Sequence, residues 1–406
     1  MRAKPLANIR VIDLTRLLPG PMCTLYLADM GADVIKIEDP RVGDYARAAA
    51  GPDRSPSAYF LCANRNKRGF QLDLDLPRGR EVFLDLAKDA DVIVESFRPG
   101  VVDKLGIAYK TIEAINPRIV YCSITGYGQT GPYRARAGHD LNYCAYAGIT
   151  DQIGHKDGPP AIPNIQFADL AGGTLSAAMG ILAALVDAGR SGVGRYIDVS
   201  MTDCALVNAI VPLIGYLDFG RVAPRGADLL SGALPCYGVY ETLDGRYMAI
   251  AAPEEKFWQA FCEAVGHPEL IPARMAVGRE GKEARARVAD IFKAHPMAWW
   301  LEKLAGVDCC VSPVLDLEES MENEHFKARE MFVKTDRYFD NHGDNGGDNG
   351  GTGEEMTQFA FPLKISDFEF SVERLAPRRG EHSAEILAEI GYSDERIEAL
   401  AREGVI

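Results

Sequence analysis

The sequence has no Cys-X-X-Cys pair, no long run of basic residues and no apolar stretch as long as the roughly 20 residues that a membrane-spanning helix requires. Its nine cysteines are scattered, so we expect buried, reduced thiols and no disulfide framework. The formal net charge of -14 opposes binding to a phosphate backbone. These absences argue against membrane insertion, a disulfide scaffold and nucleic acid as a partner.

A targeting segment is also lacking. Residues 1–14 run almost directly into a strand-like segment without the apolar core of a signal peptide, and the final residues GVI do not form a peroxisomal address. We therefore expect a protein of the cytoplasm or of an organellar matrix, and the cytoplasm is the prediction that we keep. Hydrophobic residues make up 47% and charged residues 25% of the 406 residues, as in ordinary folded domains, and the length predicts two domains or one domain with an insertion.

The first third of the chain has the pattern of a doubly wound α/β layer. Residues 9–40 contain an apolar strand, a Pro/Gly turn, an amphipathic helix and a second apolar strand, which form a βαβ unit. Helix-like segments at 81–90 and 110–116 then alternate with strand-like segments at 91–97 and 119–128. No Gly-X-Gly-X-X-Gly follows the first strand, so ordinary dinucleotide binding is not predicted, although the topology can still be similar.

The composition and the predicted secondary structure change near Gly226, in the middle of the chain. Before it we expect an apolar, Ala-rich helix at 169–191, a strand at 195–201 and one apolar helix at 204–217. After it, residues 236–252 indicate a β-hairpin, and several helices follow up to about residue 325. The sequence therefore predicts a large domain over 1–225 and a small α+β domain over 226–325.

The C-terminal segment covers residues 326–406. Residues 341–355 are rich in Gly, Asn and Asp and predict a flexible loop. Residues 381–404 predict two short amphipathic helices.

Polar residues of three kinds follow the predicted elements and are candidates for chemistry. Basic residues are the first kind, and phosphate binding or surface ion pairs explain them equally well. The second is His139 beside Asp140, which is either a structural histidine or a proton-transfer group. The third is Asp169, which is either the N-cap of the following helix or a reactive carboxylate. The basic candidates are Arg65, Lys67, Arg68, Arg98 and Lys104.

Successive segments resemble the motifs of the family III CoA-transferase (CaiB/BaiF) superfamily, in order from about residue 8 to about residue 315. Within it, the sequence is most similar to the α-methylacyl-CoA racemases. The segments are VIDLTRLLPGP, GADVIKIE, NRNKR, ESFRPGVVDKLG, SITGYGQTGP, AGHDLNY, ADLAGG and GRYIDVSM.

The resemblance implies an interlocked homodimer. Each subunit would have a large Rossmann-like domain formed by both chain ends, with residues 326–406 returning to it, and a small domain between. An acyl-CoA thioester would bind along the large domain. The implied CoA and substrate contacts are Leu17, Leu72, Ser96, Phe97, Arg98, Lys104, Gly138, Asp140 and Tyr143.

Two positions depart from the superfamily pattern. Asp39, after VIKIE, and Asp75, after QLDL, stand where basic residues are common. Contacts to the CoA adenosine and phosphates must therefore differ, and Lys36, Arg41 or Arg78 are the substitutes that we consider.

The resemblance also implies the catalytic groups. Asp169 serves both activities of the superfamily: in a CoA-transferase it forms an acyl anhydride, whereas in a racemase it transfers a proton. His139 matches the racemase histidine, and Glu254 matches a glutamate that supports it, with Glu255 one residue away as the other possible alignment. Backbone N–H groups beyond Asp169, where Gly172 and Gly173 permit close approach, are candidate donors to an enolate oxygen.

We therefore expect a racemase that inverts the α-carbon of 2-methylacyl-CoA thioesters without a metal or redox cofactor. The alternatives are CoA transfer between carboxylic acids and, outside catalysis, a thioester-binding protein that has lost activity. Opposite-face proton transfer needs an acid and a base that both work near neutral pH, which requires a raised pKa for Asp169.

Overall fold

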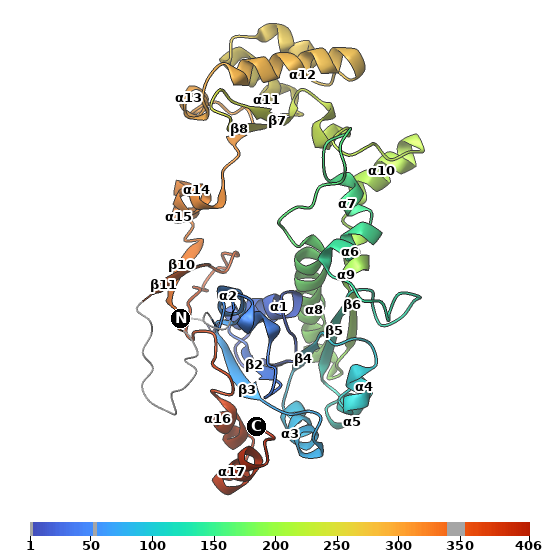
Figure 1. The fold of residues 1–406 in the computed structure, drawn as a ribbon, viewed down its shortest axis with the longest axis vertical. Helices are drawn as coiled ribbons and strands as arrows, with labels where there is room; N and C mark the ends of the chain where they lie inside the picture. Colours follow the sequence, from blue (N-terminus) through green and yellow to red (C-terminus); the bar gives the residue numbers. More distant parts are fainter. Residues whose placement is uncertain (1–2, 52–54, 339–353) are drawn as a thin grey trace. The chain divides into compact units, whose positions relative to one another are not determined.

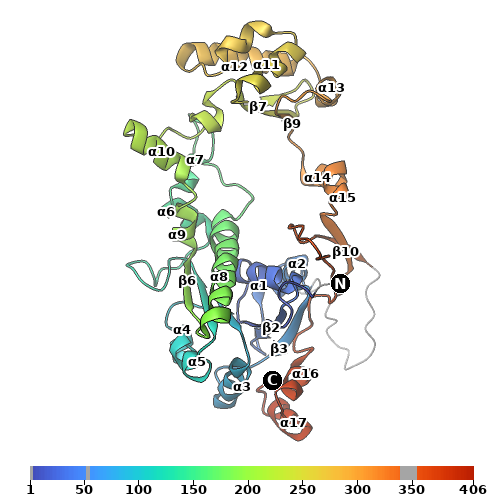
Figure 2. The same ribbon diagram turned by 180° about the vertical axis from the view of Figure 1, so that it is seen from behind.

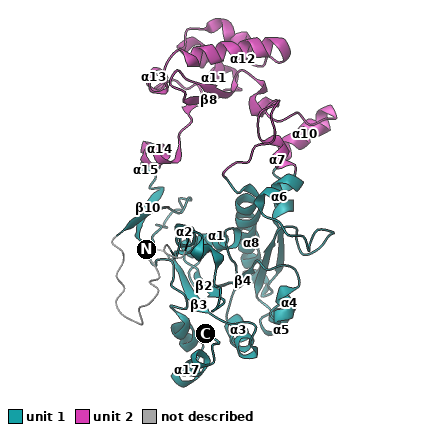
Figure 3. Ribbon diagram, viewed as in Figure 1, with its two compact units in different colours: residues 1–147, 165–208, 325–406 teal, residues 148–164, 209–324 magenta. Residues whose placement is uncertain are grey.

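The computed structural model describes residues 3–51, 55–338 and 354–406, which form two compact units (Figure 3). Unit 1 comprises residues 1–147, 165–208 and 325–406, and unit 2 comprises 148–164 and 209–324. Residues 148–164 and 209–225, expected in the large domain, thus belong to unit 2. The Arg225 guanidinium joins these two stretches, because it donates to the carbonyl of Asp151 and to that of Gly158.

Unit 1 is built on a six-stranded parallel sheet in the order β3-β2-β1-β4-β5-β6, the order of doubly wound nucleotide-binding folds (Figure 1). The α/β class and the Rossmann-like topology expected from the sequence are therefore confirmed. The strands are β1 (Arg10–Asp13), β2 (Asp33–Glu38), β3 (Lys67–Gln71), β4 (Val92–Glu95), β5 (Val120–Thr125) and β6 (Tyr196–Ser200).

Helices cover both faces of this sheet. On one face, Ile12, Ile35 and Phe70 join a buried cluster with residues of α3, α5, α16 and α17. On the other face, α1 packs against β1, β2 and β4, and α8 packs against β5 and β6. The helices are α1 (Pro19–Asp29), η1 (Tyr45–Ala48), α2 (Ala58–Asn64), α3 (Pro77–Lys88), α4 (Val101–Leu105), α5 (Tyr109–Ile115), α6 (Asp140–Tyr146), η3 (Ala168–Leu175), α8 (Ser176–Ser191), α9 (Met201–Leu206), α16 (Ser383–Glu389) and α17 (Asp394–Arg402).

The last residues of the chain return to the first. Figures 1 and 2 show α16 beside β3 and α17 beyond α16, and the backbone N–H of His382 donates to the carbonyl of Gly69 over 2.9 Å. An antiparallel pair, β10 (Phe332–Asp336) and β11 (Glu355–Phe359), precedes them and was not predicted. Most of the loop predicted at 341–355 lies outside the described residues, and its last residue, Glu355, begins β11.

Unit 2 contains a three-stranded antiparallel sheet, β7-β8-β9, whose first two strands form the predicted hairpin with Gly245 at φ +74°. Trp258 is fully buried in its core, and its indole N–H donates to the carbonyl of Leu270 over 3.0 Å. The elements are α7 (Ile149–Gln152), α10 (Ile210–Phe219), η4 (Leu229–Ala233), β7 (Tyr237–Glu241), β8 (Tyr247–Ala251), α11 (Glu255–Ala264), η5 (Pro268–Ala273), α12 (Gly278–Lys293), α13 (Met297–Lys303), β9 (Val311–Pro313), α14 (Leu317–Glu322) and, at the boundary with unit 1, α15 (Glu324–Ala328).

Three expectations about helices and thiols have clear outcomes. Residues 204–217 do not form one helix, because α9 ends at Leu206 and α10 begins at Ile210. The continuous helix 168–191 is long and apolar enough, by length and composition, to cross a membrane, so the expectation that no such stretch exists is wrong. In the structure one side of it packs on α1, α9 and the sheet, whereas Met179 and Val186 at other positions are exposed. All nine cysteines are free, as expected, but they are not all buried: Cys62 and Cys204 are partly exposed and Cys310 is exposed.

Candidate active site

A large cavity of unit 1, of about 840 Å³, opens at the carboxyl ends of β1, β4 and β5. The strand order reverses between β1 and β4, and ligands of doubly wound sheets bind at such a reversal. The segments that follow these strands supply Leu17, Phe97 and Tyr127 to its walls, whereas His139 and Asp169 come from segments further along the chain.

His139 precedes the first residue of α6 and is exposed to the cavity that it lines. Its backbone N–H donates to the Asn142 side-chain oxygen over 3.1 Å, and this bond fixes the start of the helix. Gly138 has to be glycine, because a Cβ atom there would lie 2.7 Å from the Tyr143 ring. The Tyr143 hydroxyl in turn donates to the Gly138 carbonyl. The segment before His139 is therefore held against the ring of Tyr143.

Asp169 lies in the first turn of η3 and faces the same cavity. Burial, and secondarily the Asp140 carboxylate, raise its pKa from 3.8 to about 7. Asp140 is close because its Oδ1 accepts the backbone N–H of Asp169 over 3.0 Å. The raised pKa expected for a proton-transfer group is thus present. A carboxyl with this pKa exchanges protons readily near neutral pH.

Two expectations about η3 are corrected. Phe167, not Asp169, is the N-cap residue, so capping does not explain the aspartate. Gly172 and Gly173 do not line the cavity: added Cβ atoms would lie 2.7 Å from the Met201 carbonyl oxygen and 2.8 Å from the Pro19 side chain, respectively. The glycines therefore serve the close packing of η3 on α9 and on the start of α1.

The loop after β1 has a constrained backbone. Leu17 has φ +65°, an uncommon conformation for a residue with a Cβ atom. Its N–H donates to Asp44 Oδ1 over 3.1 Å, and the other oxygen of Asp44 lies 2.9 Å from Lys36 Nζ. Both Asp44 and Lys36 have fully buried side chains. This buried ion pair supports the wall of the cavity, so Lys36 is not free to contact CoA.

The basic segment 64–68 is structural. Arg65 pairs with Asp29 at 2.7 Å and Lys67 with Asp13 at 3.1 Å, all with side chains almost completely buried. Arg68 binds Asp33, Glu385 and Glu389. Strand β3, which begins at Lys67, was not predicted from the sequence. Its alternation sends Lys67 to one face of the sheet and Arg68 to the other.

The phosphate-binding interpretation of these three residues is therefore wrong. Removing Lys67 alone would leave the Asp13 carboxylate unpaired in the interior, at a cost of about 3 to 5 kcal/mol.

Arg98 is one of three exposed arginines that line the cavity, with Arg134 and Arg136, and it forms no ion pair within the parts of the chain that the structure describes. Arg16 also lines the cavity; its guanidinium lies 5.4 Å from the centre of the Tyr45 ring and 5.8 Å from that of Phe97. The Phe97 backbone N–H is anchored to the buried Glu95 carboxyl over 2.7 Å. Two guanidinium groups thus stand beside an aromatic wall, which suits an anionic ligand with flat groups.

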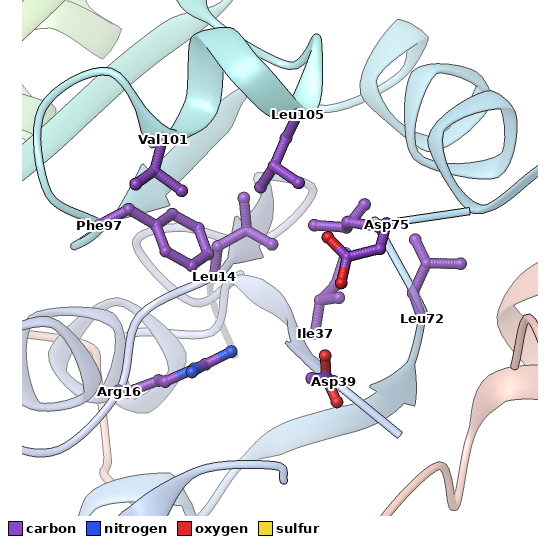
Figure 4. Close-up of a pocket in the computed structure, with 10 residues that line it drawn as sticks. Leu14, Arg16, Ile37, Asp39, Leu72, Asp75, Phe97, Val101 and Leu105 are labelled. Atoms are coloured by element: carbon purple, nitrogen blue, oxygen red, sulfur yellow. The ribbon is translucent and has the colours of Figure 1, made fainter. Parts of the chain in front are cut away.

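A second cavity, of about 180 Å³, adjoins the first and lies at the ends of β1, β2 and β3 (Figure 4). Leu14, Arg16, Phe97 and Val101 line both cavities. Leu72 lines only the second. An extended ligand could therefore reach from the second cavity, past Arg16, to His139 and Asp169.

The predicted contacts divide into four groups. The large cavity is lined by Leu17, Ser96, Phe97, Arg98, Gly138, His139, Tyr143 and Asp169. The second cavity adds Leu72. Asp140 and Lys104 line neither cavity. Asp140 contacts the site through the backbone N–H of Asp169, and Lys104 is an exposed residue of α4. Glu254 and Glu255, at the start of α11, are exposed residues of unit 2, and their part in the site stays a prediction.

Sequence reasoning missed Tyr59 and Arg16. Tyr59 lines the large cavity, where burial, and secondarily the charge of Asp169, raise its pKa to about 12. Arg16 lies in the segment VIDLTRLLPGP, beside Leu17, but was not singled out there. Tyr59 comes from α2, a helix that was not predicted. Only the packing of α2 beside α1 brings its phenol to the site.

The comparisons with known proteins agree with this geometry. Residues 6–383 match the model of CoA-transferase family III. Alpha-methylacyl-CoA racemase of Homo sapiens is 33% identical over 404 residues, which cover 99% of this chain and 97% of that protein. The succinyl-CoA–L-malate CoA-transferase beta subunit of Chloroflexus aurantiacus is 33% identical over 413 residues, 99% of this chain and 98% of that subunit. A solved CAIB/BAIF family protein from Brucella suis has a TM-score of 0.80 at 30% identity, covering 96% of this chain and 100% of that one.

A doubly wound sheet with a partly buried carboxyl of raised pKa in the cavity at its topological switch point defines this site as that of an α/β enzyme. The chain belongs to CoA-transferase family III. Because racemases and CoA-transferases occur among its relatives at similar identity, membership does not choose between the two reactions.

Proposed function

We propose that the protein is an α-methylacyl-CoA racemase-like enzyme that inverts the α-carbon of 2-methylacyl-CoA thioesters through an enolate. One observation carries the proposal: His139 lines the same cavity as Asp169, whose pKa is raised to about 7. A transferase needs the aspartate, whereas a 1,1-proton transfer needs two groups that exchange protons near neutral pH. The presence of the histidine therefore favours racemisation.

The reaction uses the two groups in turn. One removes the proton from the carbon next to the thioester carbonyl, and the electron pair of the broken C–H bond moves into an enolate. The other then delivers a proton to the opposite face of that carbon. Asp169 with a pKa of about 7 is populated both as acid and as base at neutral pH. In the proposal Glu254 orients the His139 ring, and neither a metal nor a redox cofactor takes part.

The thioester carrier lies across the two adjoining cavities. Its adenosine enters the second cavity and its diphosphate lies near Arg16 and Arg98. The pantetheine arm then passes Leu17 and Phe97 towards Asp169. The four lining residues common to the two cavities support this placement.

CoA transfer between carboxylic acids is the second candidate. The CoA-transferases among the relatives favour it. Here the Asp169 carboxylate attacks the thioester carbonyl, the C–S bond breaks, CoA leaves as a thiolate and a mixed anhydride remains. The thiolate then attacks the aspartyl carbonyl of this anhydride, the donor acid leaves and an aspartyl-CoA thioester remains. The acceptor carboxylate attacks that thioester and releases the thiolate again, which attacks the acceptor carbonyl of the second anhydride, forms the new thioester and frees the Asp169 carboxylate. This route requires Asp169 as its anion, which the raised pKa disfavours below about pH 7.

Proton exchange distinguishes the two reactions. A 2-methylacyl-CoA is incubated with enzyme in heavy water without an acceptor acid, and NMR follows α-deuterium in wild type, His139→Ala and Asp169→Ala. Racemisation predicts incorporation by wild type, lost in both variants. Absence of exchange, together with CoA transfer to an added acid and trapping of the acyl-enzyme by hydroxylamine, would replace the proposal by the second candidate.

We also propose that the enzyme is an interlocked homodimer of the cytoplasm that acts in lipid metabolism. Helix α10 supports the dimer, because its apolar side chains are exposed in the single chain: Leu217 is 69% and Phe219 73% exposed. A second copy of the chain would cover them. Such apolar surface would also suit branched fatty or sterol acyl groups at the subunit interface.

A further inference from the structure

Glu95 is a buried carboxyl that the proposed reaction does not use. It is the last residue of β4, is 1% exposed and lines neither of the two cavities. Burial, and to a smaller extent the charges of Asp198 and Asp103, raise its pKa from 4.5 to about 7. An ionised carboxyl in the interior is costly unless hydrogen-bond donors surround it. The presence of Glu95 at the edge of the site therefore calls for a physical reason.

Hydrogen-bond donors reach this carboxyl from two segments. The backbone N–H of Phe97 donates to Glu95 Oε2 over 2.7 Å and so closes a turn directly after the strand. The hydroxyl of Ser123, which is the register partner of Glu95 on β5, donates to the carboxyl as well. The Ser123 oxygen in turn accepts the Tyr196 hydroxyl of β6 over 3.1 Å. Glu95 is thus fixed by two neighbouring strands and itself fixes the start of the loop.

Phe97 is the residue through which this hydrogen bond affects the site. Its ring lines both cavities, and Figure 4 shows it beside Leu14 and Val101. The Arg16 guanidinium lies 5.8 Å from the centre of the ring. Because Phe97 belongs to the loop and not to β4, the position of its ring depends on the direction in which the chain leaves the sheet. The bond from its N–H to Glu95 sets that direction.

We propose that Glu95 is a positioning residue for the carrier: its carboxylate holds the Phe97 backbone so that the ring stands ready where the thioester passes. The inference rests on the proposed binding of an acyl-CoA, but both candidate reactions require that binding. A ring that is already in place loses less conformational entropy on binding than one that has to be ordered. A carboxylate suits this task, because a charge-assisted hydrogen bond is about twice as strong as a neutral one.

Stability separates this role from a purely structural one. Since the folded-state pKa of Glu95 is raised from 4.5 to about 7, its ionisation lowers the stability progressively between these values, and the full loss is present above about pH 7. Glu95→Gln keeps the size of the side chain and removes the charge. We expect its thermal unfolding midpoint at pH 8 to equal or exceed that of wild type, while its affinity for CoA falls. A lower midpoint with an unchanged affinity would overturn the proposal.

Calorimetric titration of the whole protein with CoA at pH 8 measures the affinity. Glu95→Gln should raise the dissociation constant by about three- to tenfold, because a neutral amide holds the N–H less tightly. Ser123→Ala, which leaves the carboxylate but removes its support on β5, should act in the same direction and by less. The control is Glu113→Gln, an equal charge change in α5, which should bind CoA as wild type does. Wild-type affinity in both test variants would overturn the proposal alone, whereas failure of wild type to bind CoA would overturn the proposed function too.

A double-mutant cycle tests whether the effect passes through Phe97. Phe97→Ala removes the ring, so the addition of Glu95→Gln should then change the dissociation constant less than about twofold. Fully additive effects would overturn the proposal. In α-proton exchange, Glu95→Gln should raise KM with little change in kcat, because Phe97 contacts the carrier and not the reacting carbon. A fall in kcat at unchanged KM would contradict a positioning role in binding.

Discussion

The pairing of Asp140 with Asp169 makes a quantitative prediction about pH. Burial contributes most to the rise of the Asp169 pKa from 3.8 to about 7, and the Asp140 charge contributes the smaller part. Asp140→Asn removes that charge, while its amide oxygen still accepts the Asp169 N–H. We therefore expect the pKa of Asp169 to fall by about one pH unit, which corresponds to a charge interaction of ordinary strength at a partly buried site.

The assay is the pH dependence of kcat/KM for α-proton exchange, measured for the enantiomer from which Asp169 removes the proton. A base must be ionised, so the wild-type rate should fall as the pH drops through about 7. In Asp140→Asn this fall should occur near pH 6. The control variant Asp89→Asn, which removes a charge at the C-terminal end of α3, should behave as wild type. An acid limb that stays in place in Asp140→Asn would refute the coupling of the two carboxyls.

Three further predictions concern stability, binding and assembly. Because the folded-state pKa of Asp169 is raised from 3.8 to about 7, this carboxyl lowers the stability progressively as the pH rises between these two values, and the full loss is present above about pH 7. Asp169→Asn should therefore raise the thermal unfolding midpoint at pH 8, and the gain should vanish near pH 4. Arg98→Ala should raise KM for the thioester about tenfold with little change in kcat, whereas Arg190→Ala, on the exposed end of α8, should not. Leu217→Asp in α10 should shift sedimentation from dimer towards monomer, whereas Leu243→Asp, 58% exposed in the β7–β8 turn, should leave the dimer intact.

The local sequence pattern was sufficient to predict much of the secondary structure of unit 1. The run from Ile9 to Glu38 alternates between strand and helix periods, and the structure has β1, α1 and β2 there. The same holds for the hairpin around Gly245 and for the two C-terminal helices. In the hairpin and the C-terminal helices the period of the apolar residues sets one face, which must be buried whatever its partner is. By contrast, β1, β2 and α1 are buried on nearly all sides, so α1 is not the amphipathic helix that was expected. The motifs also placed His139, Asp169 and Arg98 among the candidates.

Which side chains contact one another, by contrast, was decided by the tertiary structure. Lys67 and Arg98 are both basic residues near strands, yet Lys67 is buried against Asp13, whereas Arg98 stands open at the cavity. Nothing in their neighbours distinguishes them, because a charge becomes structural only when a carboxylate from a distant segment is packed against it. The raised pKa of Asp169 has the same origin. Its residue type and motif were evident from the sequence, but its burial and its contact with Asp140 exist only once η3 packs beside α6.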